Sequence, residues 1–436
     1  MNRSRLAVLT AAALVAGACS DGAQPGVSPD FDGPIAAASA RAPEQVMPGE
    51  VVVKVKDGVD VSEVGRAHGL ALGQRGKGNA FAVLRGAVGN EHANANALKN
   101  DPRVEWAEPN ILRQVEAIDP RLWAFFNPGG LNMKYTSGKS NGQNLPASYA
   151  SLSDADIDNI EGIAAGGSPV VVGAVDTGVD LDHPEFTGRL IVGYDWYNND
   201  ATPQDDDGHG THTAGTMAGA TVGVAGIAGA AANVKINVQK VCGRRGCPIA
   251  AIANGIRAAA DVPNMVAINV SIGGTSLSQA EKDALAYATS KNVLVIVSAG
   301  NSNVGTVECP ACDPNAISVG ATDWKDTRAA YSNWGAGLDL TAPGGYCYSN
   351  TTSDGCIYSS VIDGYGWMQG TSMAAPQVTG TAAIVASKTG LRGAALRARL
   401  ESTADDKGAA GYDTTFGNGR LNAYRAVTNT SLGSGL

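Results

Sequence analysis

A serine, a histidine and an aspartate lie in three short motifs whose residue types could together break an acyl bond. Ser372 stands in the motif GTSMAAP at residues 370–376, where small neighbours leave room for a substrate. We expect a helix to begin at Ser372 with Pro376 inside its first turn, where a missing N–H costs little. The hydroxyl would then lie at the positive end of the helix dipole. Because serine alone is a poor nucleophile, it needs a general base and a group that orients this base.

Two upstream residues could supply these groups. His209, in the motif DGHGTH at residues 207–212, could take the serine proton and return it to a leaving amine. Asp176, in the motif VDTG at residues 175–178, ends a predicted strand and could hold the histidine in one tautomer. Taken singly, Asp176 could equally be a turn residue and His209 a structural histidine. His212, the third residue after His209, is assigned to structural support.

The chain order Asp, His, Ser is that of subtilisin and differs from the order in chymotrypsin and the α/β-hydrolases. With the motifs in this order, residues 165–425 resemble the subtilisin family of serine peptidases. The resemblance implies a serine endopeptidase that works through an acyl-enzyme on extended protein substrates, with Asp176, His209 and Ser372 as catalytic residues. It also implies that Asn301, in the motif VSAGN, donates to the oxyanion, although an Asn here could also be a turn residue.

The same resemblance assigns two walls of a substrate cleft. Residues 271–273 would pair with the substrate backbone as an added strand, and residues 298–300 would line the first specificity pocket. Glu308 and the loop at 309–312 would shape the floor of this pocket, and an acidic floor would favour basic substrate side chains. The assigned substrate-binding residues are Ser271, Ile272, Gly273, Ser298, Ala299 and Gly300.

From residue 168 the chain alternates apolar runs with helical stretches, which predicts a parallel sheet covered on both faces. Strands are expected at residues 170–175, 234–241, 265–270, 293–298, 316–320 and 338–342. Helices are expected at residues 211–220, 249–260, 278–290, 372–388 and 392–402. The predicted fold class is therefore α/β, with a doubly wound, mainly parallel sheet of the subtilisin type in a catalytic domain of residues 115–430.

Residues 48–114 are predicted to form a smaller domain before this sheet. Strands at 50–55, 80–84 and 104–110 and helices at 61–70 and 91–98 would give one open sheet with two helices on a face. The domain resembles the inhibitory propeptide of subtilases, a small ferredoxin-like α/β unit, and an unrelated small domain is the alternative. The resemblance implies a self-processing zymogen whose propeptide is an intramolecular inhibitor and folding aid. Its last segment would lie in the cleft like a product, with cleavage within residues 114–119.

The first residues have the pattern of an export signal. Two arginines precede an apolar stretch, and small residues at 16–18 mark a cleavage site, so residues 1–18 are assigned to a signal peptide. Cys19 follows directly, as in a bacterial lipoprotein signal, which predicts a lipid on Cys19; ordinary cleavage that leaves a free thiol is the alternative. Residues 19–47, poor in large apolar side chains, are assigned to a linker. The predicted location is extracellular or in the cell envelope.

The chain has seven cysteines, and an exported protein is expected to oxidise them. Six of them fall into three local pairs, and Cys19 is left over. The motif CPAC at residues 309–312 could instead be a redox or metal motif, although no second Cys/His pair lies nearby. The predicted disulfides are Cys242 with Cys247, Cys309 with Cys312, and Cys347 with Cys356.

The charge balance of 32 basic and 41 acidic residues, without basic runs, argues against a nucleic-acid partner. Triad chemistry requires no cofactor, and we expect a monomer. Structural calcium is common in the family, and Asp195, Asp200 and residues 205–207 carry suitable oxygen ligands. A solvated acidic loop is equally consistent with these residues, so the metal ligands are unknown at this point.

Other functions for the same residues remain open. A catalytically silent envelope lipoprotein could use this fold as a binding module, and an esterase or acyltransferase could use the same three side chains. The presence of all four catalytic groups, Asp176, His209, Ser372 and Asn301, favours the peptidase.

Overall fold

The structure is a computed structural model, and it describes residues 46–115, 166–220, 226–229, 231–323, 326–346 and 356–430. The predicted signal peptide, Cys19, nearly all of the predicted linker and the segment 120–165 lie outside the described residues. The domain boundaries derived from the sequence therefore stay predictions.

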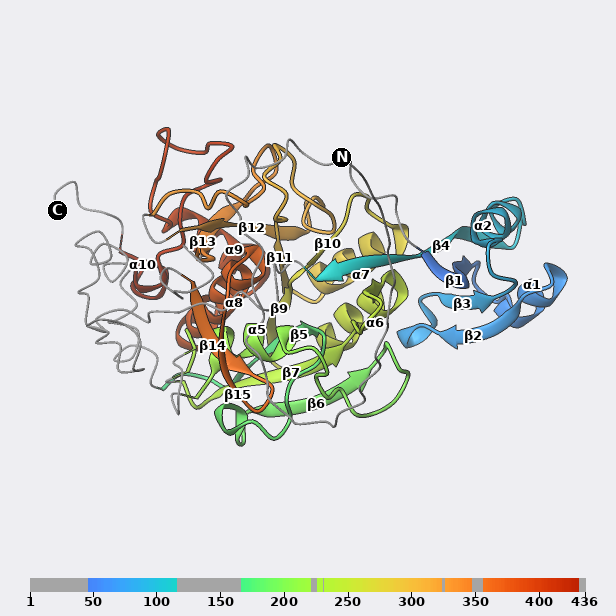
Figure 1. Cartoon of the computed structure of the whole chain (residues 1–436), viewed down its shortest axis with the longest axis horizontal. Coiled ribbons are helices and arrows are strands. Elements are labelled where there is room, and N and C mark those ends of the chain that lie inside the picture. The colour runs from blue at the N-terminus through green and yellow to red at the C-terminus, as the bar shows by residue number, and fades with distance from the viewer. Residues whose placement is uncertain are drawn as a thin grey trace, which may run out of the picture. The chain divides into compact units, whose positions relative to one another are not determined.

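Seven parallel strands form the central sheet, and β5 lies near its middle between β9 and β7 (Figure 1). The carboxyl ends of parallel strands meet at one edge of a sheet, where ligand sites commonly form. In spatial order the strands are β13 (Leu340–Pro343), β12 (Ala316–Thr322), β11 (Leu294–Ser298), β9 (Met265–Val270), β5 (Val170–Asp176), β7 (Val234–Lys240) and β6 (Leu190–Asp195).

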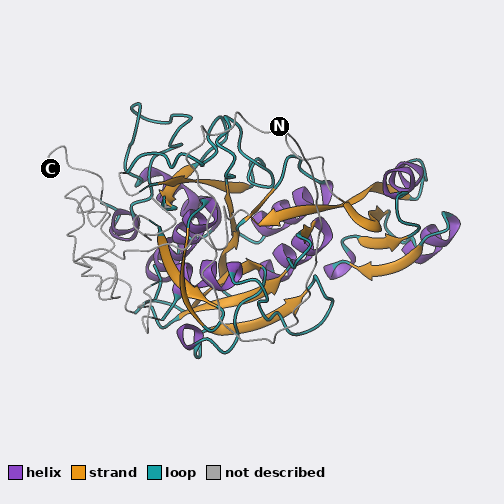
Figure 2. Cartoon of the chain, in the orientation of Figure 1, coloured by secondary structure: helices purple, strands orange, loops and turns teal. Residues whose placement is uncertain are grey.

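Helices cover both faces of this sheet (Figure 2). Along β5, Val170 and Val172 pack into one hydrophobic core and Val171 and Val175 into another, which explains the continuous apolar run. The first core contains residues of α5 (His209–Ala218), α8 (Thr371–Thr389), α9 (Gly393–Ser402) and α10 (Ala423–Thr428), and the second contains residues of α6 (Ile249–Ala260) and α7 (Gln279–Ser290).

The predicted α/β class with a doubly wound, mainly parallel sheet is thus confirmed. The sequence did not reveal the edge strand β6 or the hairpin of β14 (Ile357–Val361) and β15 (Gly364–Met368). It also overstated the apolar character of β7, because Asn237 and Gln239 are buried there. Their amides bond to each other at 2.8 Å, which offsets the cost of burying them.

Helix α8 begins at Thr371, one residue before the predicted start, and Pro376 lies beyond its first turn, contrary to the prediction. A proline at this position cannot donate a backbone hydrogen bond to the carbonyl of Ser372. The hydroxyl of Ser271 donates to that carbonyl instead, at 3.0 Å. The helix therefore tolerates the proline because a side chain from another element satisfies the freed acceptor.

The N-terminal described unit is an antiparallel sheet with spatial order β4-β1-β3-β2 and two helices. In β1, Val51 and Val53 pack with these helices, whereas Val52 joins the core that contains α6 and α7. Short, exposed β2 had no recognisable apolar pattern. The elements are β1 (Val46–Val55), α1 (Val61–Ala67), β2 (Ala71–Arg75), β3 (Ala82–Arg85), α2 (Glu91–Lys99) and β4 (Val104–Val115).

Strand β4 continues past this unit. Its backbone pairs antiparallel with β8 (Cys247–Pro248) and with β10 (Ile272–Gly273). The end of β4 is thus held by two short strands as an added strand.

Arg189 is a buried cation that binds backbone carbonyls near the start of β6. Its guanidinium donates to the carbonyl oxygens of Ala228, Gly229 and Ala231. Among the described residues, no helix has the length and apolar character needed to cross a bilayer.

Candidate active site

Asp176 and His209 lie in contact at the carboxyl edge of the central sheet. Asp176 is the last residue of β5, and His209 is the first residue of α5. Nδ1 of His209 lies 2.7 Å from Oδ1 of Asp176, and the two side chains are 1% and 0% exposed. The N–H of Thr177 also donates to Asp176 Oδ1 at 2.7 Å, so the backbone fixes the carboxylate that orients the imidazole.

Nearby charges control the protonation of His209. Burial disfavours the imidazolium, but the carboxylates of Asp176, Asp207 and Asp205 favour it, and their combined effect raises the pKa of His209. Nε2 of His209 is buried without a hydrogen-bond partner among the described residues. When Nδ1–H donates to Asp176, the neutral ring therefore presents an acceptor lone pair at Nε2.

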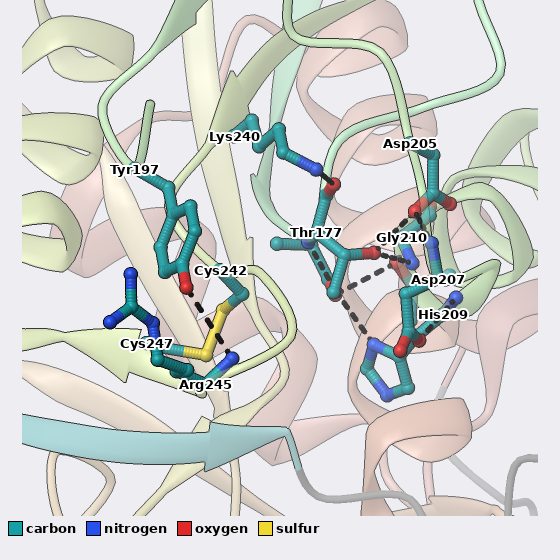
Figure 3. Close-up of a disulfide and its surroundings, with 12 residues drawn as sticks. Thr177, Tyr197, Asp205, Asp207, His209, Gly210, Lys240, Cys242, Arg245 and Cys247 are labelled. Atoms are coloured by element: carbon teal, nitrogen blue, oxygen red, sulfur yellow. Dashed lines mark hydrogen bonds and ion pairs between the residues drawn. A yellow bond between two sulfur atoms is a disulfide. The ribbon is translucent and has the colours of Figure 1, made fainter. Parts of the chain in front are cut away.

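A second carboxylate joins the end of β5 to the start of α5. Asp205 Oδ1 accepts the hydroxyl of Thr177 at 2.8 Å, and Asp205 Oδ2 accepts the N–H of Thr211 at 2.9 Å. The hydroxyl of Thr177 in turn accepts the N–H of Gly210 at 2.8 Å. Figure 3 shows this cluster around His209. These contacts fix the distance between the strand that carries Asp176 and the helix that carries His209.

Lys240 adds a buried ammonium group behind this cluster. Its Nζ donates to the carbonyl of Thr177 at 2.7 Å (Figure 3). It also donates to the carboxylate of Asp206 at 2.5 Å. The parallel register of β5 and β7 places Lys240 opposite Asp176. The sequence analysis missed this contact, and its only signal was a charged residue at the end of a strand predicted to be apolar.

Ser372 and Asn301 come together at the start of α8. Asn301 follows β11, and its Oδ1 accepts the N–H of Thr371 at 2.9 Å and the hydroxyl of Thr371 at 3.0 Å. The N–H of Gly300 donates to the hydroxyl of Thr371 at 3.2 Å. Because β5 and β11 are parallel members of one sheet, their ends bring Asn301 and the residues that begin α8 to the same sheet edge as Asp176.

The two predicted walls of the cleft belong to different segments, and different backbone hydrogen bonds hold each of them. Ile272 and Gly273 form β10, which pairs with the end of β4. On the other wall, the carbonyls of Ala299 and Gly300 accept the N–H groups of Glu308 and Asn333, each at 2.9 Å.

The two remaining predicted wall residues and the proposed floor residue also have defined places. Ser271 and Ser298 are fully buried. The carboxylate of Glu308 accepts the hydroxyl of Ser302 at 3.1 Å. A Cβ atom at Gly300 would lie 2.8 Å from Glu308 Cδ, so this acidic side chain packs directly against Gly300.

The two other buried histidines near the site bind backbone carbonyls. His183 Nε2 lies 2.8 Å from the carbonyl oxygen of Gly364, and His212 Nε2 lies 3.1 Å from that of Ile357. Burial, aided by the charge of His209, lowers the pKa of His212 to about 3. His212 therefore stays neutral and serves as a link between α5 and β14.

Two of the three predicted cysteine pairs are disulfides in the structure, Cys242–Cys247 and Cys309–Cys312. Cys356 is also disulfide-bonded, and Cys347, the partner that the sequence predicts for it, lies outside the described residues. The CPAC motif is therefore a closed disulfide loop and not a metal-binding pair.

The acidic run at residues 205–207 does not fit a calcium site. Asp205 is occupied by N–H and hydroxyl donors, and Asp206 pairs with Lys240. Upstream, Asp195 accepts two backbone N–H groups and the amide of Asn198. No three His, Cys, Asp or Glu side chains converge as metal ligands within the described parts of the chain.

Comparison with known families gives two matches along the chain. Residues 167–419 match the profile of the Subtilase family, and residues 33–110 match that of the Fervidolysin N-terminal prodomain. The two matches cover the parallel sheet with its edge residues and the antiparallel N-terminal unit, respectively.

Individual relatives match most or part of the chain. A thermophilic serine proteinase of Bacillus sp. (strain AK1) is 37% identical over 388 residues, which is 87% of each chain. Thermitase of Thermoactinomyces vulgaris is 39% identical over 264 residues, or 60% of this chain and 90% of thermitase. The crystal structure of fervidolysin from Fervidobacterium pennivorans, a keratinolytic enzyme related to subtilisin, has a TM-score of 0.66 at 26% identity and covers 91% of this chain and 63% of fervidolysin.

Proposed function

Because the chain belongs to the subtilase family of serine endopeptidases, we propose that Asp176, His209 and Ser372 are its catalytic triad. The observation that carries the proposal is the 2.7 Å contact between His209 and Asp176, at the sheet edge where the helix of Ser372 begins. The buried acceptor at His209 Nε2 is the group required to take a serine proton.

The chemistry then proceeds through an acyl-enzyme. Ser372 Oγ attacks the carbonyl carbon of a peptide bond while His209 Nε2 removes the hydroxyl proton. Asp176 holds the Nδ1–H and stabilises the imidazolium, which protonates the leaving amine. A water molecule, deprotonated by His209, attacks the ester on Ser372; the ester bond breaks, the imidazolium returns its proton to Ser372 Oγ, and the new carboxyl terminus is released.

The developing oxyanion requires hydrogen-bond donors placed before the reaction begins. With Oδ1 of Asn301 engaged by Thr371, the Nδ2 group is the part of this side chain that donates. The N–H of Ser372 supplies the second donor at the start of α8.

The N-terminal unit acts as an inhibitory propeptide in this proposal. Glu108 accepts the N–H groups of Gln279 and Ala280, each at 2.9 Å, and Asn110 accepts the N–H of Ala250 at 3.0 Å. These contacts cap the starts of α7 and α6. The pairing of β4 with β8 and β10 supports binding of its end like an extended substrate. Self-cleavage within residues 114–119 would then separate the two units.

Export and anchoring are part of the proposal and rest on the sequence alone. Residues 1–18 would direct secretion, and a lipid on Cys19 would hold the precursor at the cell envelope until cleavage frees the catalytic unit. We expect protein substrates with a loose sequence preference. The family favours this, and so does the pairing at the two short strands, which uses backbone atoms and not side chains.

Expression of the full chain with Ser372→Ala in a protease-free host tests self-processing. We expect the variant to keep its propeptide, whereas the parent chain should lose it, as shown by mass and N-terminal sequence. Loss of the propeptide from the variant would refute self-cleavage.

A fluorophosphonate probe separates the peptidase from a silent binding module. The processed parent chain should be labelled on Ser372 with loss of activity toward a protein substrate. A folded, processed chain that refuses the label would favour the envelope binding module. Labelling with cleavage of esters but not of proteins would favour the esterase.

A further inference from the structure

We infer that the Cys242–Cys247 disulfide positions strand β8 so that the cleft can hold the outer part of an extended peptide. This inference rests on the proposed function and extends it to a determinant of substrate length. Strand β8 contains only Cys247 and Pro248. The few backbone hydrogen bonds that two residues can form are not enough to hold the strand in position. One of its two residues is covalently tied by the disulfide.

The backbone register shows what β8 holds. Cys247 pairs with Arg113 and Pro248 with Leu112, whereas Ile272 and Gly273 of β10 pair with Val115 and Gln114. The two short strands therefore contact successive parts of the same bound segment. Because β4 runs from residue 112 toward residue 115, β8 holds the part that is farther from its C-terminal end.

The other half of the disulfide is fixed to the catalytic strand. The N–H groups of Val241 and Cys242 donate to the backbone carbonyl of Asp176, at 2.8 and 3.2 Å. The sulfur of Cys242 then reaches Cys247. A short path of one disulfide and two backbone hydrogen bonds thus joins the peptide-binding edge to the residue that orients His209, and both cysteines are fully buried.

The loop of residues 243–246, which connects the two cysteines, is also held by hydrogen bonds. Gly243 and Gly246 form a two-way backbone bridge, and the N–H of Arg245 donates to the hydroxyl of Tyr197 at 3.4 Å. Figure 3 shows Tyr197 beside the disulfide, with the cluster around His209 on the opposite side of Lys240. A Cβ atom at Gly243 would overlap the Tyr197 ring, so the loop packs closely on this side chain.

The disulfide Cys309–Cys312 offers a matched comparison. Its loop is of similar length, and Cys309 exchanges two backbone hydrogen bonds with Gly274, directly after β10. It supports the inner part of the cleft, which every substrate uses, and not β8. Its removal should affect short and long peptides equally.

The test uses enzyme processed from the full chain and a nested series of blocked peptide p-nitroanilides of one to six residues. Fluorophosphonate titration counts active sites. In the parent enzyme, kcat/KM should rise when the peptide becomes long enough to reach β8. In C242A/C247A we expect about a tenfold loss on the long peptides, the worth of one or two backbone hydrogen bonds, mainly through KM. The shortest peptides should be cleaved as by the parent.

The ratio of long-peptide to short-peptide kcat/KM decides the inference. A merely stabilising disulfide would leave this ratio unchanged, as we expect for C309A/C312A, and an unchanged ratio in C242A/C247A would overturn the proposal. If C242A/C247A does not fold, C242V/C247A restores buried volume without the covalent link and is judged by the same ratio. A parent enzyme that neither titrates nor cleaves any peptide would instead refute the proposed function and, with it, this inference.

Discussion

The ammonium nitrogen of Lys240 lies 2.7 Å from the carbonyl oxygen of Thr177, the residue that follows Asp176. The lysine side chain is 1% exposed, and its second partner, Asp206, reaches the surface at 48% exposure. A buried charge in such a position is costly unless it is paired and hydrogen-bonded. Lys240 therefore stabilises the backbone that presents the aspartate to His209.

Lys240→Met should loosen this backbone while keeping the apolar stem of the side chain. We expect the free energy of unfolding to fall by about 1–3 kcal/mol, because a buried carbonyl loses its donor. We also expect kcat to fall more than KM changes, because Asp176 is no longer held in place. Denaturant unfolding and steady-state kinetics measure both effects. The exposed Lys291→Met should stay within about 0.5 kcal/mol of the parent, and a parent-like kcat in Lys240→Met would contradict the positioning role.

Asp207→Asn should shift the acidic limb of the activity profile. Catalysis needs neutral His209, and the raised pKa of His209 places this limb above the ordinary histidine value. Removing the Asp207 charge lowers that pKa, so kcat/KM should persist to lower pH. The same carboxylates also stabilise the folded protein when His209 is charged. This contribution to the free energy of unfolding is fully present at acidic pH and is lost as pH rises through the pKa of folded His209.

The control for this profile is Asp182→Asn, which removes an exposed carboxylate that is not among the main charges acting on His209. Its limb should coincide with that of the parent. A limb that moves toward higher pH in Asp207→Asn would mean that another group controls the profile.

Asn301→Asp keeps the acceptor for Thr371 but replaces the oxyanion donor. Loss of the equivalent kind of donor in subtilisin lowers kcat by about 10²–10³-fold, and we expect a similar loss here with little change in KM. Ser302→Ala, at the next residue, should retain parent-like kcat. A kcat within tenfold of the parent in Asn301→Asp would argue against the oxyanion role.

Glu108→Gln should weaken inhibition by the propeptide. A carboxylate that accepts two N–H groups at the start of α7 gains from the helix dipole. A neutral amide gains less, by about 1 kcal/mol, or roughly fivefold in affinity. The full chain with this change should become active after a shorter lag. Glu105→Gln, on the same strand but paired with Lys54, should keep the parent lag, and equal lags in both would exclude this role for Glu108.

Structural calcium stays a prediction without assigned ligands, because N–H donors already occupy the carboxylates of Asp195 and Asp205. We expect EDTA to lower the thermal midpoint of unfolding by several degrees, because an ion that binds only the folded state stabilises it. Added calcium should restore the midpoint, and an EDTA-independent midpoint in the parent would exclude a structural calcium ion.

The elements that position the site could be predicted because their patterns are local. The buried run of β5, the small-residue start of α8 and the helical stretch that became α7 each depend on neighbours in the sequence. The motif order then brought Asp176, His209 and Ser372 to one candidate site before any coordinates. In the structure, His209 Nδ1 lies 2.7 Å from Asp176 Oδ1.

What the sequence could not predict depends on register between distant strands. Lys240 reaches Thr177 only because β7 pairs with β5 in one register. The hydroxyl of Ser271 donates to the carbonyl of Ser372, which lies 101 residues further along the chain. The edge strand β6 is half exposed and has no continuous apolar run. The role of the Cys242–Cys247 bridge likewise appears only once β8 is seen beside β4.

The guanidinium of Arg189 supplies a permanent positive charge to the three backbone carbonyls that it binds next to β6. A dissociable cation at the same three carbonyls would be bound to an extent that depends on its concentration in the medium. Here the charge is covalently attached to the chain. The three carbonyls next to β6 therefore keep this donor whatever the ionic composition of the medium, as long as the protein stays folded.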